Sequence, residues 1–372
     1  MLVKENNFVR IFIMLDDNYY RSNFLTNENS NRYMRIVSKQ LELCADGMPW
    51  GIPQRAKLGL FQINTEMLTL AREAKGLTQK ELAVQIGCRQ SRLSKIEAGE
   101  LVPNEDDIKG FVQVLGRIRD FFFQQGPAMP ASVSFYRKTQ TLPLKMLRQC
   151  NALMNVQRLQ IESQIGQTKL GERELPFLPP DKANGGAMAV AQELRQRWGI
   201  NGGAVQYLTK LVEDAGCVIV EYPFPTAKLD GLCIRAEHKT PIIFLNKDLA
   251  KSRLRLSLAH ELGHLVMHTN PHEDVEDEAW EFAAEFLMPT EEIEQQLDGL
   301  NLDKLGQLKK QWGVSMQAIL VRAKKLGKIS ESYYRFLWMQ IGKCGYRMNE
   351  PFEDAIQNEK PTELEKRLKT NL

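Results

Sequence analysis

Four of the five histidines in the chain lie within 13 residues, at His260, His264, His268 and His272. Residues four apart on an α-helix lie ~40° apart around its axis and one turn along it, so this spacing predicts one helical face rich in imidazole groups. Apolar residues at positions 256, 258, 262 and 265 favour such a helix, from about 249 to 268. The fold must therefore contain a largely buried helix that carries polar side chains.

Within this helix, residues 260–264 have the sequence His-Glu-Leu-Gly-His. At this spacing His260 and His264 can both bind one Zn²⁺, while Glu261 projects ~100° away and can activate a water without competing as a ligand. The motif also occurs by chance, and two histidines four apart can simply be a packed pair. The apolar surroundings favour a metal, because a polar group in a buried helix needs compensation.

A third ligand is expected on the next helix, predicted from Val275 to Leu287. Glu276, Asp277 and Glu278 open that helix, twelve to fourteen residues after His264. Acidic side chains also stabilise a helix N-terminus, so three capping residues are the alternative. One ligand among them is favoured, because a site with two histidines alone would bind weakly.

A second pattern predicts five short helices between residues 64 and 123. Thr78 and Glu81 form a capping box at the start of the second helix. The third helix, from about 90 to 98, has exposed amide, hydroxyl and cationic side chains that suit base edges. Gln79 and Lys80 begin the preceding helix, where side chains contact phosphate. Alternatively, the cations only solvate a helix face. The candidate DNA-binding residues are Gln79, Lys80, Gln90, Ser91, Arg92 and Lys95.

Residues 77–83, Gly87 and residues 90–99 resemble the helix-turn-helix of the XRE/Cro repressor family, over residues 64 to about 120. The resemblance implies an ion pair between Arg72 and Glu97, on the first and third helices. It also implies a homodimer that binds a double-stranded, near-palindromic DNA operator.

Residues 259–268 (Ala-His-Glu-Leu-Gly-His-Leu-Val-Met-His) and 276–289 resemble the ImmA/IrrE family of metallopeptidases, over residues 187 to 330. The resemblance implies a zincin-like domain with bound Zn²⁺, with Glu276 rather than Glu278 as the third ligand. Bound Zn²⁺ would acidify a water and polarise the scissile carbonyl, with Glu261 as the general base. The chain departs from the family pattern at Trp280, where a small polar residue is common. Trp280 therefore either packs in the core or disturbs the support of a ligand.

The pattern as a whole predicts a mostly helical α+β protein with a small three-stranded sheet, at 217–222, 229–235 and 241–245. The predicted divisions are a leader at 1–60, with disorder as one alternative; a helix-turn-helix at 61–124; a helical linker at 125–186; a peptidase domain at 187–350; and a charged tail at 351–372. The leader has no assigned role.

Composition restricts the partners and the compartment. A formal net charge of +3 predicts neither nucleic-acid nor membrane binding, so DNA binding must depend on a local surface. No apolar run approaches the ~18 residues of a membrane span. The six cysteines contain no Cys-x-x-Cys pair, which favours reduced thiols and a cytoplasmic protein.

Two main hypotheses follow. The first is a DNA-binding regulator with an active zinc endopeptidase that cleaves a repressor-type protein. The second is a non-catalytic transcription factor, or a toxin–antitoxin component, whose peptidase-like domain senses a signal or binds a partner. His268 lies ~12 Å along the helix from His260, so a structural or substrate-side role is expected for it. His272 is predicted to be a loop residue without a role.

Overall fold

The computed structural model describes residues 63–124, 142–165, 175–235, 240–269 and 272–370. The predicted leader, residues 1–60, lies outside these ranges. The chain divides into two compact units, residues 1–128 and 129–372, each of which is described here by itself. The prediction of a mostly helical protein with one small three-stranded sheet is confirmed.

The first unit contains α4 (Thr65–Ala74), α5 (Gln79–Gln85), α6 (Gln90–Glu97), α7 (Glu105–Leu115) and the 3₁₀ helix η2 (Arg119–Phe123). The fifth of the predicted short helices is the 3₁₀ helix η2. Gly116 separates it from α7, which ends there in the left-handed conformation with φ 65°. The apolar faces meet in one core, whose fully buried members include Met67, Leu82, Leu93, Phe111 and Phe122.

Local sequence signals account for the turn between α5 and α6. The predicted capping box is present, with Thr78 and Glu81 each bonded to the backbone of the other. Gly87 has φ +74°, a conformation that costs glycine little and other residues more. The turn therefore brings α6 across α5, as in a helix-turn-helix.

The second unit is built on a sheet of β1 (Val218–Tyr222), β2 (Gly231–Ile234) and β3 (Ile242–Asn246). The strand order is β1-β3-β2, with β1 parallel and β2 antiparallel to β3. All five residues of β3 are buried, as expected for a central strand covered on both faces.

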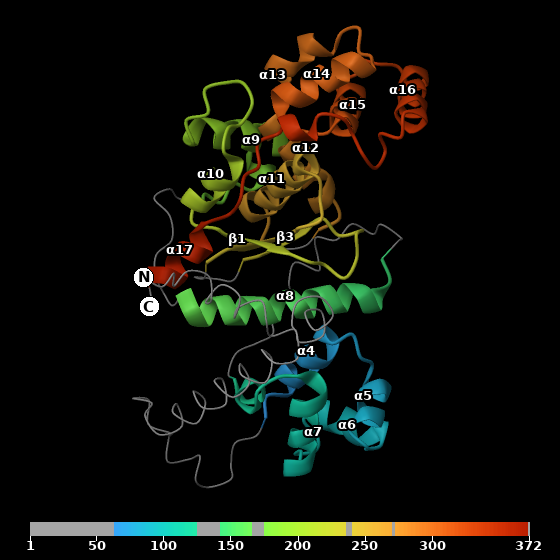
Figure 1. Ribbon diagram of the computed structural model, residues 1–372. Helices are drawn as coiled ribbons and strands as arrows, with labels where there is room; N and C mark the ends of the chain where they lie inside the picture. The colour runs from blue at the N-terminus through green and yellow to red at the C-terminus, as the bar shows by residue number, and fades with distance from the viewer. Residues whose placement is uncertain (1–62, 125–141, 166–174, 236–239, 270–271, 371–372) are drawn as a thin grey trace, which may run out of the picture. The chain divides into compact units, whose positions relative to one another are not determined.

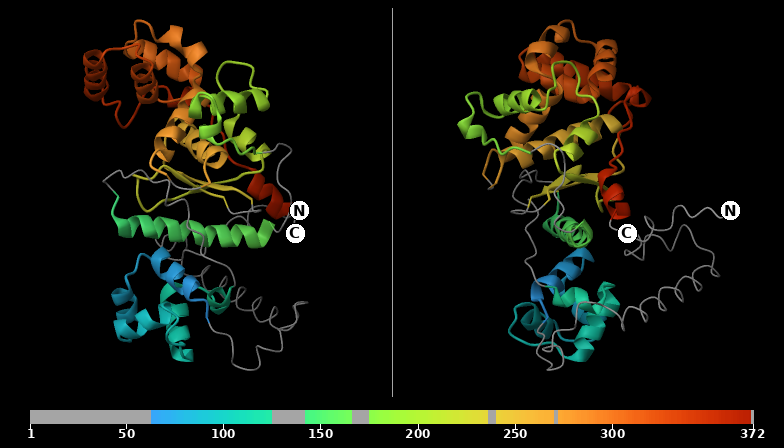
Figure 2. Two further views of the ribbon diagram at one scale, coloured as in Figure 1. Left: turned by 180° about the vertical axis from the view of Figure 1, so that it is seen from behind. Right: turned by 90° about the vertical axis from the view of Figure 1, so that its left-hand side faces the viewer.

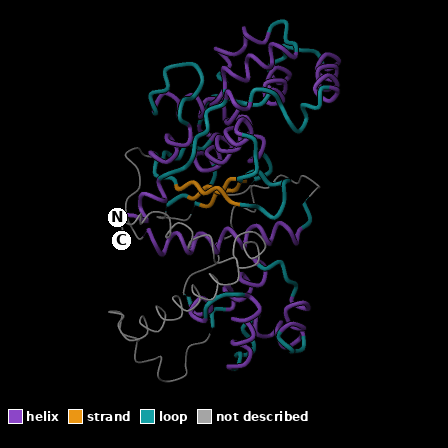
Figure 3. Tube along the Cα trace, viewed as in Figure 1, coloured by secondary structure: helices purple, strands orange, loops and turns teal. Residues whose placement is uncertain are grey.

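Helices cover both faces of this sheet (Figures 1 and 2). One face carries α9 (Gly186–Arg197), α10 (Leu208–Asp214), α11 (Lys251–Met267) and α12 (Val275–Leu287). The long helix α8 (Leu144–Ile165) runs along the other face. Figure 3 shows how small the sheet is beside the surrounding helices.

The remaining helices of this unit are η4, which precedes α9, and the helices that follow α12. They are η4 (Pro180–Lys182), α13 (Thr290–Ile293), η5 (Glu294–Leu297), α14 (Leu302–Trp312), α15 (Met316–Lys325), α16 (Glu331–Lys343), η6 (Glu353–Ala355) and α17 (Glu363–Thr370). None of the helices in the described ranges combines the length and apolar content that a membrane span needs.

Two segments that were predicted to lie outside the peptidase domain belong to the second compact unit. Helix α8, from the predicted helical linker, lies in this unit and packs against α17. The predicted charged tail is also part of this unit, because Glu359 pairs with the buried Arg255 and Glu353 with the buried Lys309. The charges of the tail compensate buried cations, which a charge pattern alone does not reveal.

Candidate metal centre and nucleic-acid interface

Helices α11 and α12 pack closely because Gly263 has no side chain. A Cβ atom at Gly263 would lie 2.9 Å from Cδ1 of Phe282, well inside van der Waals contact. This close approach brings the first turn of α12 beside the histidines of α11. The glycine of the motif therefore serves the packing between the two helices.

We expect Gly263→Ala to destabilise the protein by about 1–3 kcal/mol, because the added methyl group overpacks the contact with Phe282. The methyl group should also push α12 away from α11 and weaken zinc binding, since the candidate ligands lie on both helices. Urea denaturation and chelator competition measure the two effects. Wild-type stability in this variant would contradict the close packing.

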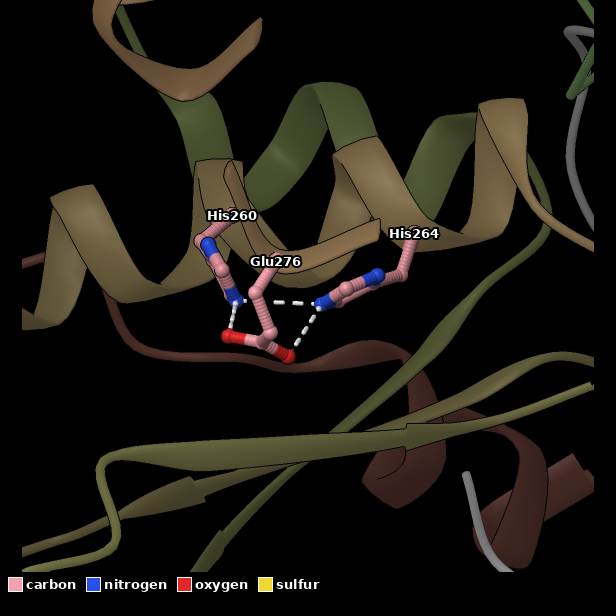
Figure 4. Close-up of side chains that lie close together, drawn as sticks. All are labelled: His260, His264 and Glu276. Atoms are coloured by element: carbon pink, nitrogen blue, oxygen red, sulfur yellow. Dashed lines mark hydrogen bonds and ion pairs between the residues drawn. The ribbon is translucent and has the colours of Figure 1, made fainter. Parts of the chain in front are cut away.

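The three predicted metal ligands lie together (Figure 4). The Nε2 atoms of His260 and His264 are 3.0 Å apart, and the carboxylate of Glu276 lies 3.5 Å from the first and 3.3 Å from the second. Both histidines are buried, and one ligand atom from each of the three residues lies within 4.8 Å of the others.

This donor set fits zinc. Tetrahedral bonds of ~2.0–2.1 Å require ligand atoms to be about 3.3 Å apart, close to the separations among these three residues. Two imidazole nitrogens and one carboxylate, with further positions left for water or substrate, are the donors typical of a catalytic zinc site.

The protonation states also suit metal binding. Burial lowers the pKa of His264 to about 3, so its imidazole is neutral at pH 7. Burial opposes ionisation of Glu276, but hydrogen bonds with His260 and His264 outweigh it and lower the pKa of Glu276 to about 2. A metal needs a neutral imidazole and an ionised carboxylate, and both are present at neutral pH.

Glu261 lies beside this centre but points to strand β2. Burial raises the pKa of Glu261 to about 7, although the charge interaction with His260 and the hydrogen bond with Cys233 partly offset this effect. Gly231 leaves room for the carboxylate, because a Cβ atom at Gly231 would lie 3.2 Å from Oε1 of Glu261. A carboxyl group that titrates near neutral pH can both accept and donate a proton.

Trp280 covers one side of the centre. Its ring lies 4.1 Å from that of His260, and it is only half-buried, so it lines the site rather than filling the core. Among the described residues, Nδ1 of His260 is buried and has no hydrogen-bond partner. Trp280 therefore contacts the ring of His260 without accepting a hydrogen bond from it, whereas a small polar side chain could supply an acceptor.

We expect Trp280→Asn to strengthen zinc binding by about tenfold, since a partner for the second nitrogen of a ligating histidine typically changes affinity by ~10–100-fold. Competition with a chelator measures the affinity. Unchanged or weaker binding would mean that the missing partner of His260 is not limiting.

His268 and Glu278 lie outside the three-residue centre but contact it. Nδ1 of His268 is 3.0 Å from Nδ1 of His264, and its Nε2 is 2.9 Å from the Glu278 carboxylate. Glu278, the alternative third ligand, therefore lies with His268, whereas Glu276 lies with His260 and His264. His272, for which no role was expected, lies 3.4 Å from Glu278.

The candidate DNA-binding residues lie in and before α6. Lys80, Gln90, Ser91 and Lys95 are exposed. Three of the six side chains also bond within the domain. Arg92 forms an ion pair with Asp107 at 2.6 Å, Gln79 donates to Glu97 at 2.9 Å, and Gln90 donates to Gln79 at 3.0 Å.

Helix α6 also forms an ion pair with α4 and has a further cation at its N-terminus. The expected ion pair between Arg72 and Glu97 is present, at 2.6 Å. Arg89, absent from the predicted set, is exposed at the residue that precedes α6. Its position beside the helix N-terminus was the signal that could have included it.

Comparison with protein families finds two matches. Residues 66–120 match a helix-turn-helix domain, and residues 212–324 match the IrrE N-terminal-like domain, a peptidase family. The two matches lie on the segments whose motifs resembled these families, so the expected resemblance is confirmed. A comparison with curated proteins found no match.

Proposed function

We propose that the protein is a DNA-binding transcriptional regulator whose second unit is a zinc-dependent endopeptidase acting on a repressor-type protein. The observation that carries the proposal is the meeting of His260, His264 and Glu276 beside the buried Glu261. The match to a peptidase family supports the same activity. A repressor-type substrate follows from the resemblance to ImmA/IrrE proteins.

The residues divide into two roles. His260, His264 and Glu276 would hold Zn²⁺, which when bound polarises a scissile carbonyl and acidifies a water. Glu261 accepts a proton from the attacking water and delivers it to the leaving amine. Its pKa of about 7 suits both transfers.

The first unit would hold the protein on an operator. Gln90, Ser91 and Lys95 form an exposed polar face on α6 that suits base edges, and Lys80 at the start of α5 suits phosphate. Repressors of this class bind as dimers to two half-sites about one helical turn apart. We therefore propose a homodimer on a near-palindromic site.

A second candidate function is supported by Trp280. The aromatic ring over His260 and the unpartnered nitrogen beside it would suit a weakened metal centre. In that case the protein is a non-catalytic transcription factor, or a toxin–antitoxin component, that uses the domain to sense a signal or bind a partner.

Zinc content and cleavage together test the proposal. Purified wild-type protein is expected to contain one zinc ion per chain and His264→Ala almost none. Incubation with purified XRE-type repressors encoded near its gene should give cleavage that a chelator abolishes. Absence of zinc from the wild type would overturn the metal centre, and bound zinc without cleavage would favour the second function.

DNA binding is tested separately on an operator selected from random DNA. The double variant Gln90→Ala, Lys95→Ala is expected to bind at least tenfold more weakly, since each base contact is worth about 1–3 kcal/mol. Lys75→Ala, an exposed cation at the end of α4, is the matched control. Equal binding by the double variant would exclude this face of α6.

A further inference from the structure

We propose that His268 and Glu278 are positioning residues that set the tautomer of His264. In this arrangement Nε2 of His264 presents its lone pair to a metal held together with His260 and Glu276. The inference rests on the proposed metal centre and adds two residues to it. The juxtaposition that carries it is an unbroken line of contacts from Glu278 through His268 to His264.

The line begins where α11 ends. Its last helical residue is Met267, and His268 has extended backbone angles of φ −116° and ψ 131°. The imidazole of His268 is buried, with its two nitrogens facing different partners. One nitrogen is 3.0 Å from Nδ1 of His264, and the other is 2.9 Å from Glu278 on α12.

The number of available hydrogens decides the direction of each bond. An ionised carboxylate only accepts, so Nε2 of His268 must carry a hydrogen toward Glu278. A neutral imidazole has a single N–H, so Nδ1 of His268 is an acceptor. An acceptor then faces Nδ1 of His264 and favours the tautomer with its hydrogen there, which leaves Nε2 with the lone pair that a metal requires. The Glu276 carboxylate, 3.3 Å from Nε2 of His264, favours the other tautomer until a metal lies between them.

The other metal-binding histidine has no such support. Nδ1 of His260 is buried and lacks a hydrogen-bond partner among the residues that the structure describes. Outer partners of ligating histidines fix the tautomer and the ring orientation. Among the described residues, that function therefore falls on the line through His268.

A second metal ion is the competing interpretation, since His268, His272 and Glu278 also offer three ligand atoms within 4.8 Å. If Nε2 of His268 bound a metal, its hydrogen would move to Nδ1. Two N–H groups, on His264 and His268, would then face each other across 3.0 Å. Both sites therefore cannot be filled while the two histidines are neutral, and the half-exposed His272 makes the second site the weaker one.

The first test measures zinc affinity by competition with a chelator. His268→Phe keeps a ring but removes the acceptor, and we expect zinc to bind about 10–100-fold more weakly. His268→Gln restores a carbonyl acceptor and should recover part of the loss. His272→Ala is the matched control and should bind one zinc ion per chain with wild-type affinity.

Two results of this test would overturn the proposal. One is His268→Phe with an affinity within about threefold of wild type. The other is a second zinc ion per chain in the wild type that His272→Ala loses.

The decisive part of the second test uses the wild-type protein. With only five histidines in the chain, ¹⁵N-histidine labelling and NMR can assign the tautomer of each ring with and without zinc. In the zinc-bound protein we expect the hydrogen of His264 on Nδ1 and that of His268 on Nε2, and a mixture of His268 tautomers in Glu278→Ala. Zinc bound by Nδ1 of His264, or the hydrogen of His268 on Nδ1, would overturn the proposal. A wild type that binds no zinc but carries the hydrogen of His268 on Nε2 would refute the proposed function alone.

Discussion

Replacement of Glu261 by glutamine is expected to reduce cleavage of the proposed repressor-type substrate by about 10²–10⁴-fold, the usual contribution of a general base. Glutamine has nearly the same shape but cannot accept the proton of the attacking water. Zinc content should not change, because Glu261 is not among the three residues that meet at the candidate centre. Initial rates of cleavage and metal analysis of the same sample measure the two quantities.

Glu273→Gln is the control for this variant, because Glu273 is an exposed acidic residue before α12. Its activity should match that of the wild type. Cleavage that persists in Glu261→Gln would remove Glu261 from its role, even if the metal centre is correct. Loss of zinc in Glu261→Gln would instead show that the side chain supports the fold of the site.

A chain that ends at Met348 is expected to lose the folded second unit. The side chain of Lys309 is completely buried, and its partners are Glu350 and Glu353, at 2.9 Å and 2.5 Å. Without these carboxylates a buried ammonium group would have no compensation. Circular dichroism during thermal unfolding measures the loss.

A single substitution also tests whether carboxylates of the last segment stabilise the second unit by compensating buried cations. Glu359→Gln removes the counter-charge of the buried Arg255, whose pKa burial lowers to about 10. Removal of one partner from a buried ion pair costs about 3–5 kcal/mol, which urea denaturation resolves. Glu365→Gln, exposed on α17, should leave stability unchanged.

A stable chain ending at Met348 would contradict both predictions, because the residues after Met348 would then be a dispensable tail.

The residues after Pro351 show what a sequence pattern cannot predict. Charged residues after Pro351 are typical of a solvated tail, and the sequence has no periodicity that marks them as buried. Their partners, Arg255 and Lys309, are about a hundred and about forty residues away in the chain. Such distant ion pairs depend on the fold, because helices α11 and α14 must first be placed.

The amino-acid sequence by itself determined the features that depend on neighbours along the chain. The capping box at Thr78, the length of α12 and the three short strands all follow from residues a few positions apart. The pairing of His260 with His264 belongs to the same class, because one helical turn sets it.

Only the tertiary structure decided which groups from different elements meet. Glu276 and Glu278 both open α12, yet the first contacts His260 and His264 while the second contacts His268. That choice depends on how closely α12 approaches α11, which the contact between Gly263 and Phe282 determines. The physical reason is that spacing along one helix follows from covalent geometry, whereas the distance between two helices depends on packing over the whole domain.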